Sequence, residues 1–321
     1  MNPGPHVVAF GECMLELQGP AFGPPGSLRQ GQGGDTLNAA VYLARCGRRH
    51  GLRVDYATAL GDDGFSTGLL EAWRAEGLGT GLVRRLPGRL PGLYWIETDA
   101  GGERRFSYWR EQAAARAYFD TVDGATPLEQ AAGGIDALLF SGISLAILPP
   151  AGRQRLLALA ARLRARGAQV VFDNNYRPRL WPDAAAAREA FAGALQVASL
   201  ALLTLDDEMA LWGVADEHRA LAAALACPVP EVVLKRGALP TLVRGPGAGS
   251  AASPLAVPVQ PVPRVVDTTA AGDSFAGAYL AARLAGATPV AAAAAGNALA
   301  ARVIQHAGAL IPSTAMADLM G

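Results

Sequence analysis

The sequence predicts an α/β fold with a mainly parallel sheet and helices on both of its faces. After residue 126, short apolar runs alternate with longer stretches of helical character, for example 151–166 and 184–196. Parallel strands need such crossovers, and strands buried on both faces appear as continuous apolar runs. Half of the 321 residues are apolar, which is enough for a large core. The expected strands of this sheet are 138–140, 170–172, 200–203 and 232–234.

The N-terminal part of the chain predicts further strands and helices. A glycine turn at 31–34 leads into a segment with helical spacing that ends at Gly47, which we expect to cap the helix. Residues 61–65 are interpreted as a structural turn before the next helix. The expected strands here are 6–10, 11–17 and 54–60, and the expected helices run from about 35 to 47 and over 66–76.

Residues 82–110 have a different character. Two aromatic runs, 93–98 and 105–110, flank a turn at 100–102, which is the pattern of a β-hairpin. Four of the 12 Tyr and Trp residues of the chain lie in these runs. An exposed sheet with this much aromatic surface needs a cover, either a substrate or a second subunit.

Composition excludes several classes of protein. Charged residues make up 17% of the chain and cancel to a formal net charge of zero, so no basic excess indicates nucleic-acid binding. The most apolar helical region, 276–304, carries Arg283, Pro289 and Arg302, so it predicts a buried helix pair rather than a membrane span. The scattered cysteines and histidines follow no disulfide or metal-binding spacing, and they favour a reducing cytoplasm and structural roles: Cys13, Cys46, Cys227, His6, His50, His218 and His306.

Residues 265–284 carry the clearest chemical signal. A turn of tiny residues, 270–272, enters a segment with helical spacing, where backbone N–H groups favour a bound anion such as phosphate. Asp273 lies beside this anion site, where a carboxylate can accept a proton from an attacking hydroxyl. We expect the helix start and a bound Mg²⁺–phosphate to keep Asp273 ionised. The alternative is that Asp273 only caps the helix.

Other polar motifs follow the predicted strands. Residues 173–177 come after one apolar run and residues 235–237 after another, and ligands in such sheets bind beyond the carboxyl ends of the strands. Lys235 is the single lysine of the chain, among 28 Lys and Arg residues. This indicates that an ammonium group is needed there.

Several long motifs resemble those of the ribokinase-like (PfkB) carbohydrate kinases, over nearly the whole chain. Within that family they are most similar to the kinases of 2-keto-3-deoxygluconate. One departure is mild: the usual Gly-Ala-Gly-Asp is Ala-Ala-Gly-Asp here. The motifs are 34–38, 90–94, 108–110, 141–146, 173–181 and 267–275.

The resemblance implies two neighbouring binding sites with Asp273 as the catalytic base between them. The motif at 34–38 would contact the sugar, although by itself it also fits an ordinary strand-to-helix turn. The implied nucleotide site holds ATP with Mg²⁺. A monovalent cation is left open, as is the question of which of Asp206, Asp207 and Glu208 holds the water network around the metal. The implied sugar-site residues are Gly34, Asp35, Asn38, Tyr94, Tyr108, Arg110 and Arg177, and the implied nucleotide-site residues are Asn175, Lys235, Gly237, Ala270, Ala271, Gly272 and Asn297.

The implied reaction is transfer of the γ-phosphoryl group of ATP to the terminal 6-hydroxyl of 2-keto-3-deoxygluconate. Arg110 and Arg177 suit the carboxylate of this sugar acid, because a guanidinium binds a carboxylate with two parallel hydrogen bonds. Taken singly, either arginine also fits an exposed surface position. The alternative functions are a kinase of a neutral sugar or nucleoside and a non-catalytic sugar-binding protein. A Rossmann dehydrogenase is disfavoured, because the dinucleotide-binding fingerprint is missing.

The expected organisation is one kinase domain over residues 1–321 with a small β lid. Residues 11–32 and 82–112 are expected to build this lid across the sugar site. Exposed edges and aromatic surface favour pairing between lids. We therefore expect a homo-oligomer, a dimer or larger, formed through the lids.

Overall fold

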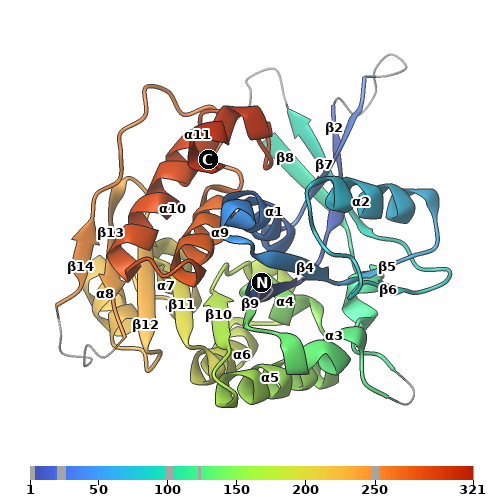
Figure 1. The fold of residues 1–321 in the computed structure, drawn as a ribbon, viewed down its shortest axis with the longest axis horizontal. Helices are drawn as coiled ribbons and strands as arrows, with labels where there is room; N and C mark the ends of the chain where they lie inside the picture. Colours follow the sequence, from blue (N-terminus) through green and yellow to red (C-terminus); the bar gives the residue numbers. More distant parts are fainter. Residues whose placement is uncertain (1–3, 20–26, 99–103, 122–123, 247–252, 321) are drawn as a thin grey trace.

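The computed structural model describes residues 4–19, 27–98, 104–121, 124–246 and 253–320. In these ranges, eight strands form one sheet in the order β14-β13-β12-β11-β10-β9-β1-β4 (Figure 1). All pairings from β12 to β4 are parallel, and β13 and β14 are antiparallel additions, which confirms the predicted mainly parallel sheet. The strands are β1 (His6–Phe10), β4 (Arg53–Ala57), β9 (Ala137–Ser141), β10 (Gln169–Asp173), β11 (Leu200–Thr204), β12 (Glu231–Arg236), β13 (Leu239–Arg244) and β14 (Leu255–Val257).

Helices cover both faces of this sheet, as predicted (Figure 1). Val8 and Phe10 of β1 point into one buried cluster, and Val7 and Ala9 point into the other, because successive side chains of a strand face opposite sides. The helices packed on the Val8 side are α3 (Pro127–Gln130), α4 (Gly142–Ile147), α5 (Pro150–Ala165), α6 (Ala184–Val197), α7 (Leu205–Trp212) and α8 (Glu217–Leu225). Those on the Val7 side are α1 (Asp35–Gly47), α2 (Gly64–Ala75), α9 (Ala271–Leu284), α10 (Pro289–Val303) and α11 (Ala317–Met320).

Two N-terminal predictions need correction. The strand predicted over 54–60 is interrupted at Thr58: β4 ends at Ala57, and β5 (Ala59–Leu60) pairs with the separate strand β6 (Arg84–Arg85). Gly47 does not cap α1 in the left-handed conformation, since its φ is −83°. The chain continues into a short 3-10 turn, and Gly51, with a φ of +69°, ends it.

The interpretation of residues 61–65 as a structural turn is confirmed. Helix α2 begins at Gly64, directly after Asp63. The Asp63 carboxylate accepts a hydrogen bond from the backbone N–H of Ser66 at 2.9 Å, which is the usual N-cap arrangement. The turn therefore serves the helix start.

A second sheet, here called the lid sheet, lies beside the main sheet (Figure 1). Its strand order is β3-β2-β7-β8, so β3 and β8 are its edges. The predicted hairpin is confirmed, since β7 and β8 are antiparallel with Tyr94 opposite Tyr108; its turn at 100–102 lies outside the described residues. The strands are β2 (Met14–Gln18), β3 (Arg29–Gly33), β7 (Gly92–Thr98) and β8 (Arg104–Trp109).

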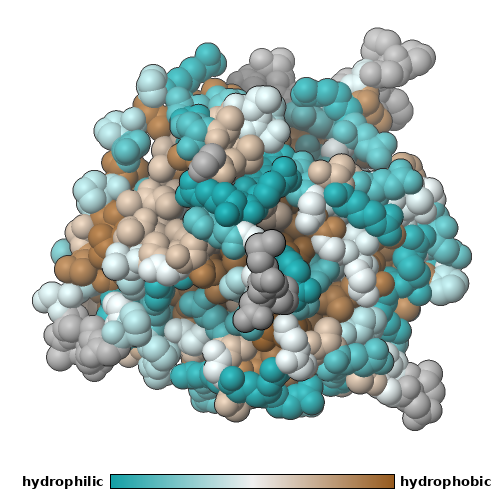
Figure 2. All heavy atoms as spheres, in the orientation of Figure 1, coloured by the Kyte–Doolittle hydropathy of each residue, from teal (hydrophilic) through white to brown (hydrophobic). Residues whose placement is uncertain are grey.

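The surface and the cysteines have ordinary properties. Figure 2 shows a mixed surface on the viewed face, with pale hydrophobic colour over α10, where the sequence is rich in alanine. Cys13, Cys46 and Cys227 are free thiols. Among the residues that the structure describes, no helix is both long enough and apolar enough to cross a lipid bilayer.

Candidate active site

Polar residues from four elements and the loop after β10 meet at the carboxyl ends of the central strands. Helices α1 and α9 both begin there, next to the ends of β9 and β10. The side chains line a small cavity, as expected for a sheet of this topology. The lining residues are Asp35, Thr36, Ala39, Leu139, Ser141, Asp173, Asn175, Asp273 and Ala276.

The turn before α9 has the geometry of an anion site. Ala270 occupies the cap position in the left-handed conformation, with a φ of +61°, and α9 begins at Ala271. The N–H groups of Gly272 and Asp273 lie in the first helical turn, where backbone donors have no partner inside the helix. Fourteen residues of aligned peptides follow, so the partial positive charge of a helix start is available to an anion.

The side chain of Asp273 does not serve α9 as a cap. The cap residue is Ala270, and Asp273 is the third helical residue. Its Oδ2 accepts a hydrogen bond of 2.9 Å from Nδ2 of Asn38, near the start of α1. The cap-only alternative is therefore wrong, and the carboxylate is directed toward the second helix start.

The surroundings of Asp273 favour its protonated form in the ligand-free protein. Burial raises the pKa of Asp273 to about 7, and the nearby negative charges of Asp35 and Asp173 act in the same direction. The hydrogen bond from Asn38 and the charge of Lys235 oppose this pKa shift. The expected ionised form of Asp273 therefore depends on the positive charge of a bound Mg²⁺–phosphate as well as on the start of α9, because the carboxylate lies among other acids.

Lys235 lies against the anion turn. Its ammonium group is 3.0 Å from Oδ2 of Asp173, at the end of the neighbouring strand but one. A Cβ placed on Gly272 would lie 3.4 Å from the Lys235 Nζ. Gly237, two residues later, has a φ of +60° and open space around it. Lys235, Gly237 and the 270–272 turn therefore all lie near the carboxyl end of β12.

Asn175 links β10 to α1. Its Nδ2 donates to Oδ2 of Asp35 at 2.7 Å, and its φ of +26° is unusual for a residue other than glycine. The adjacent Asn174 is fully buried and donates to the Thr204 carbonyl oxygen and to Glu208. Both asparagines therefore fix the shape of the loop after β10.

The three acidic residues 206–208 differ in burial. Asp206 is exposed, whereas burial raises the pKa of both Asp207 and Glu208. Asp207 accepts from the N–H of Tyr176, and its pKa also responds to the charges of Arg177, Lys235 and Asp173. Within the described ranges, no three His, Cys, Asp or Glu side chains converge as a ready metal site.

The lid sheet contributes a second polar cluster. The Tyr94 hydroxyl donates to Glu16 across the β2–β7 pair. A Cβ on Gly33 would lie 2.2 Å from that hydroxyl, so only glycine leaves room for it. Tyr108 packs beside Tyr94 with ring centres 6.0 Å apart. This face of the lid sheet is therefore an aromatic wall with a fixed phenol.

The two arginines expected to bind a carboxylate already have partners in the chain. Arg110 is buried and paired with Glu12. Arg177 is half-exposed, lies 3.5 Å from Asp207 and donates to the Tyr176 carbonyl oxygen. Each arginine keeps further donors, because a guanidinium carries five N–H groups.

Asn297 occupies an internal position. Its Oδ1 accepts from the Thr241 hydroxyl at 2.8 Å, and its Nδ2 donates to the carbonyl oxygens of Val257 and Pro258. The residue thus ties α10 to β13 and β14. That Asn297 contacts the adenine ring of the nucleotide stays a prediction.

Neither Glu12 nor Glu16 is among the site residues expected from the sequence, and Asp173 has no expected role. All three could have been noticed, because each is a carboxylate at or next to the end of an apolar or alternating strand. The sequence does not indicate which residues pair with them, because the partners Arg110, Tyr94 and Lys235 are 62 to 98 positions away.

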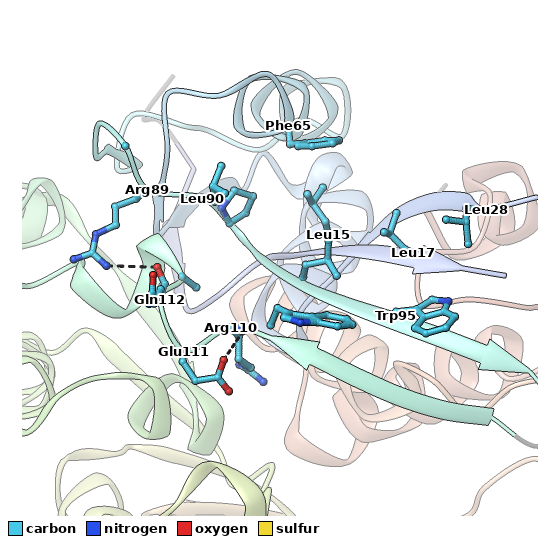
Figure 3. Close-up of a pocket in the computed structure, with 15 residues that line it drawn as sticks. Leu15, Leu17, Leu28, Phe65, Arg89, Leu90, Trp95, Arg110, Glu111 and Gln112 are labelled. Carbon is cyan, nitrogen blue, oxygen red and sulfur yellow. Dashed lines mark hydrogen bonds between the residues drawn. The ribbon is translucent and has the colours of Figure 1, made fainter. Parts of the chain in front are cut away.

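A larger apolar pocket lies on the other face of the lid sheet, between that sheet, α2 and residues 88–91 (Figure 3). Its volume is about 800 Å³. Phe65, Leu90 and Trp109 are each more than half exposed there. The apolar lining residues are Leu15, Leu17, Leu28, Phe65, Leu90, Pro91, Leu93, Trp95, Trp109 and Ala113.

Comparison with known proteins confirms the resemblance. The chain is 46% identical over 310 residues to 2-dehydro-3-deoxygluconokinase of Escherichia coli K12, covering 97% of this chain and 98% of that one. The structure of 2-dehydro-3-deoxygluconokinase from Thermotoga maritima matches with a TM-score of 0.79 and 21% identity, over 99% of this chain and 98% of that one. Fructokinase of Xylella fastidiosa with bound ATP matches with a TM-score of 0.77 and 23% identity, over 98% and 97%.

These two structural matches confirm the ribokinase-like fold. The model of the pfkB family of carbohydrate kinases matches residues 5–316. The chain therefore belongs to the pfkB carbohydrate kinase family.

Proposed function

We propose that this protein is an ATP-dependent kinase of 2-dehydro-3-deoxygluconate, also called 2-keto-3-deoxygluconate, acting on its 6-hydroxyl. The observation that carries the proposal is the meeting of Asp273, the start of α9 and Lys235 at one end of the sheet. This arrangement supplies a base, an anion site and a cation together. Identity of 46% over nearly the whole chain to a kinase of that name supports the choice of substrate.

The proposed reaction balances as a direct phosphoryl transfer. The 6-hydroxyl gives its proton to the Asp273 carboxylate as its oxygen forms a bond to the γ-phosphorus of ATP. The bond from that phosphorus to the β–γ bridging oxygen breaks, and ADP leaves with the electron pair. The N–H groups after Ala270 stabilise the charge on the transferred group.

We assign the sugar site to the small cavity at the starts of α1 and α9, together with the lid-sheet face that carries the aromatic wall. Gly34, Asp35 and Asn38 would contact hydroxyl groups, and the aromatic wall would lie over the sugar. The carboxylate would be held by the free donors of Arg110 and Arg177. The remaining residues assigned to this site are Tyr94 and Tyr108.

We assign ATP to the neighbouring side of the anion turn. Lys235 and the 270–272 turn suit phosphate groups, and the open space around Gly237 suits the rest of the nucleotide. Asn175 and Asn297 complete the assigned nucleotide site. A monovalent cation is not assigned a place.

The carboxylates near the phosphate position fit Mg²⁺, which prefers oxygen ligands, keeps several waters and binds substrate phosphates. Asp207 suits this role better than the exposed Asp206, because it already interacts with Asp173 and Lys235. When bound, Mg²⁺ would neutralise charge on the phosphates.

We also propose that residues 1–321 form one kinase domain, with a lid from 11–32 and 82–112, and that two copies associate through their lids. The apolar pocket beside α2 leaves large side chains in water, and β3 and β8 are unpaired edges within the described lid sheet. A second copy would cover both features. The free cysteines fit a cytoplasmic setting.

A substrate panel tests the proposed function. Purified protein with ATP and Mg²⁺ would be offered 2-dehydro-3-deoxygluconate, ribose, fructose and a nucleoside, with ADP release measured. We expect turnover with the sugar acid at a kcat/KM at least about 100-fold above that with the neutral compounds, as loss of paired charged contacts requires. Equal turnover with a neutral sugar would favour a neutral-sugar kinase, and no turnover with any of them would favour a binding protein.

A further inference from the structure

Glu12 is a buried carboxylate that the proposed reaction does not use. It lies two residues after β1, where the chain leaves the main sheet for the lid sheet, and its side chain is 1% exposed. Burial raises the pKa of Glu12, while the charge and hydrogen bond of Arg110 lower it. A charged group at such a site normally needs several partners, because desolvation is costly.

Three further points at which the chain enters or leaves the lid sheet lie around Glu12. A Cβ on Gly34, at the start of α1, would lie 2.2 Å from the Glu12 carbonyl oxygen. A Cβ on Gly92, the first residue of β7, would lie 2.8 Å from Glu12 Oε1. Arg110, the residue after β8, pairs with Glu12 Oε2. Glu12 thus occupies the junction through which the lid sheet is attached.

The pair with Arg110 is incomplete. Among the described residues, Glu12 Oε1 and Arg110 Nε are both buried without a hydrogen-bond partner. A buried ion pair with unused atoms is poor evidence for a stabilising role, since an apolar pair of similar size often serves stability as well. The pair instead holds the Arg110 guanidinium in one orientation.

We propose that Glu12 is a positioning residue for recognition of the substrate carboxylate; this inference rests on the proposed function of Arg110. Glu12 holds one amino group of Arg110, through Nη2, and leaves its remaining donors for the sugar acid. Glu12 itself does not touch the substrate. Arg110 is among the residues that line the apolar pocket, and Figure 3 shows it at the end of β8 with its side chain pointing away from Phe65.

The proposal has a functional consequence for the free enzyme. Without Glu12, the Arg110 side chain can adopt many rotamers, and substrate binding must then order it. Loss of Glu12 should therefore weaken binding of the sugar acid. It should leave phosphoryl transfer from the bound complex nearly unchanged, because Asp273 and the anion turn are untouched.

A kinetic double-mutant cycle tests the inference. Steady-state KM for 2-dehydro-3-deoxygluconate, kcat and the KM for ATP would be measured for Glu12→Ala, Arg110→Ala and the double variant. We expect Glu12→Ala to raise the sugar-acid KM by about 10-fold or more with kcat within about 3-fold, and the double variant to match Arg110→Ala, because residues that act through one another are not additive. Glu111→Ala is the matched control: this exposed neighbouring acid contacts the Arg110 backbone N–H, and its loss should leave KM unchanged.

Glu12→Gln keeps the test valid if Glu12→Ala does not fold. Its amide oxygen can still accept from Arg110, so we expect a KM between those of wild type and Glu12→Ala. An unchanged KM in Glu12→Ala, or in Glu12→Gln should the alanine variant not fold, would overturn the inference, as would losses that simply add in the double variant. If Arg110→Ala itself leaves KM unchanged, the proposed role of Arg110 fails first, and the inference falls with it.

Discussion

Nδ2 of Asn38 donates a hydrogen bond to Oδ2 of Asp273 at 2.9 Å, which joins α1 and α9 at their first turns. The two residues are 235 positions apart in the chain. The bond fixes the plane of the carboxylate, and Asn38 Oδ1 is buried there without a partner among the described residues. Asp273 is therefore oriented before substrate binds, which is the condition for an efficient general base.

The pH dependence of kcat/KM should report the acid cluster around Asp273. This parameter reflects the free enzyme, so activity should fall as pH drops through about 7, where Asp273 takes up a proton. Asp35→Asn removes a charge that raises this pKa, so the acid limb should move to lower pH by roughly one unit. The exposed Asp62→Asn is the control, and a limb at the same pH in all three proteins would show that Asp35 does not influence the base.

Ala270 should respond to glycine substitution differently from an ordinary helical alanine. Its φ of +61° is a conformation that strains residues with a Cβ and suits glycine. In urea unfolding, we expect Ala270→Gly to leave the free energy of unfolding unchanged or to raise it by up to about 1 kcal/mol. Ala282→Gly, inside the same helix, should lower it by roughly 1 kcal/mol. Equal losses in both variants would contradict a left-handed Ala270.

Arg177 should contribute to substrate binding although it is half-exposed. Replacing it by alanine should cost about 1.5–3 kcal/mol of interaction with the sugar acid, as for hydrogen bonds to charged groups. The loss would appear as a higher KM for 2-dehydro-3-deoxygluconate and an unchanged KM for ATP. Arg179→Ala, an exposed neighbour, should behave as wild type. Matching losses in both variants would assign the effect to general surface charge.

Association through the lid predicts a selective effect of charge in the apolar pocket. Trp109→Glu places a carboxylate at an exposed apolar position, and burying that charge between subunits is costly. We expect wild type to be a dimer or larger by light scattering at micromolar concentration and Trp109→Glu to be a monomer. Leu255→Glu changes an equally exposed residue on β14, the far edge of the main sheet, and should keep the wild-type mass. A monomeric wild type would contradict lid pairing.

The positions of the main strands and of the polar cluster at their carboxyl ends could be predicted because they depend on local patterns. The apolar runs before Asp173 and Lys235 give the strands, and parallel topology brings their carboxyl ends together. The turn at 270–272 could likewise be recognised from three small residues followed by helical spacing. Here the sequence contains both the element and the reason for it.

The rest depended on partners that are distant in the chain. Nothing near Glu12 indicates that Arg110 will pair with it, and the pKa of Asp273 depends on Asp35 and Asp173, which come from other elements. The cap predicted at Gly47 was wrong because a glycine also tolerates a right-handed turn, and the left-handed position came four residues later at Gly51. Such choices are made by packing rather than by local propensity.

The kcat of Asp273→Asn with ATP and 2-dehydro-3-deoxygluconate tests the central claim most directly. Asparagine keeps the shape and the acceptor for Asn38 but removes the basicity, and its amide can donate to the unpartnered Asn38 Oδ1. A general base contributes roughly 10²–10⁴-fold, so we predict that kcat falls by about that factor while ATP binding, measured by calorimetry, is nearly unchanged or tighter. An Asp273→Asn protein that keeps most of its wild-type kcat would contradict the assignment of Asp273 as the base.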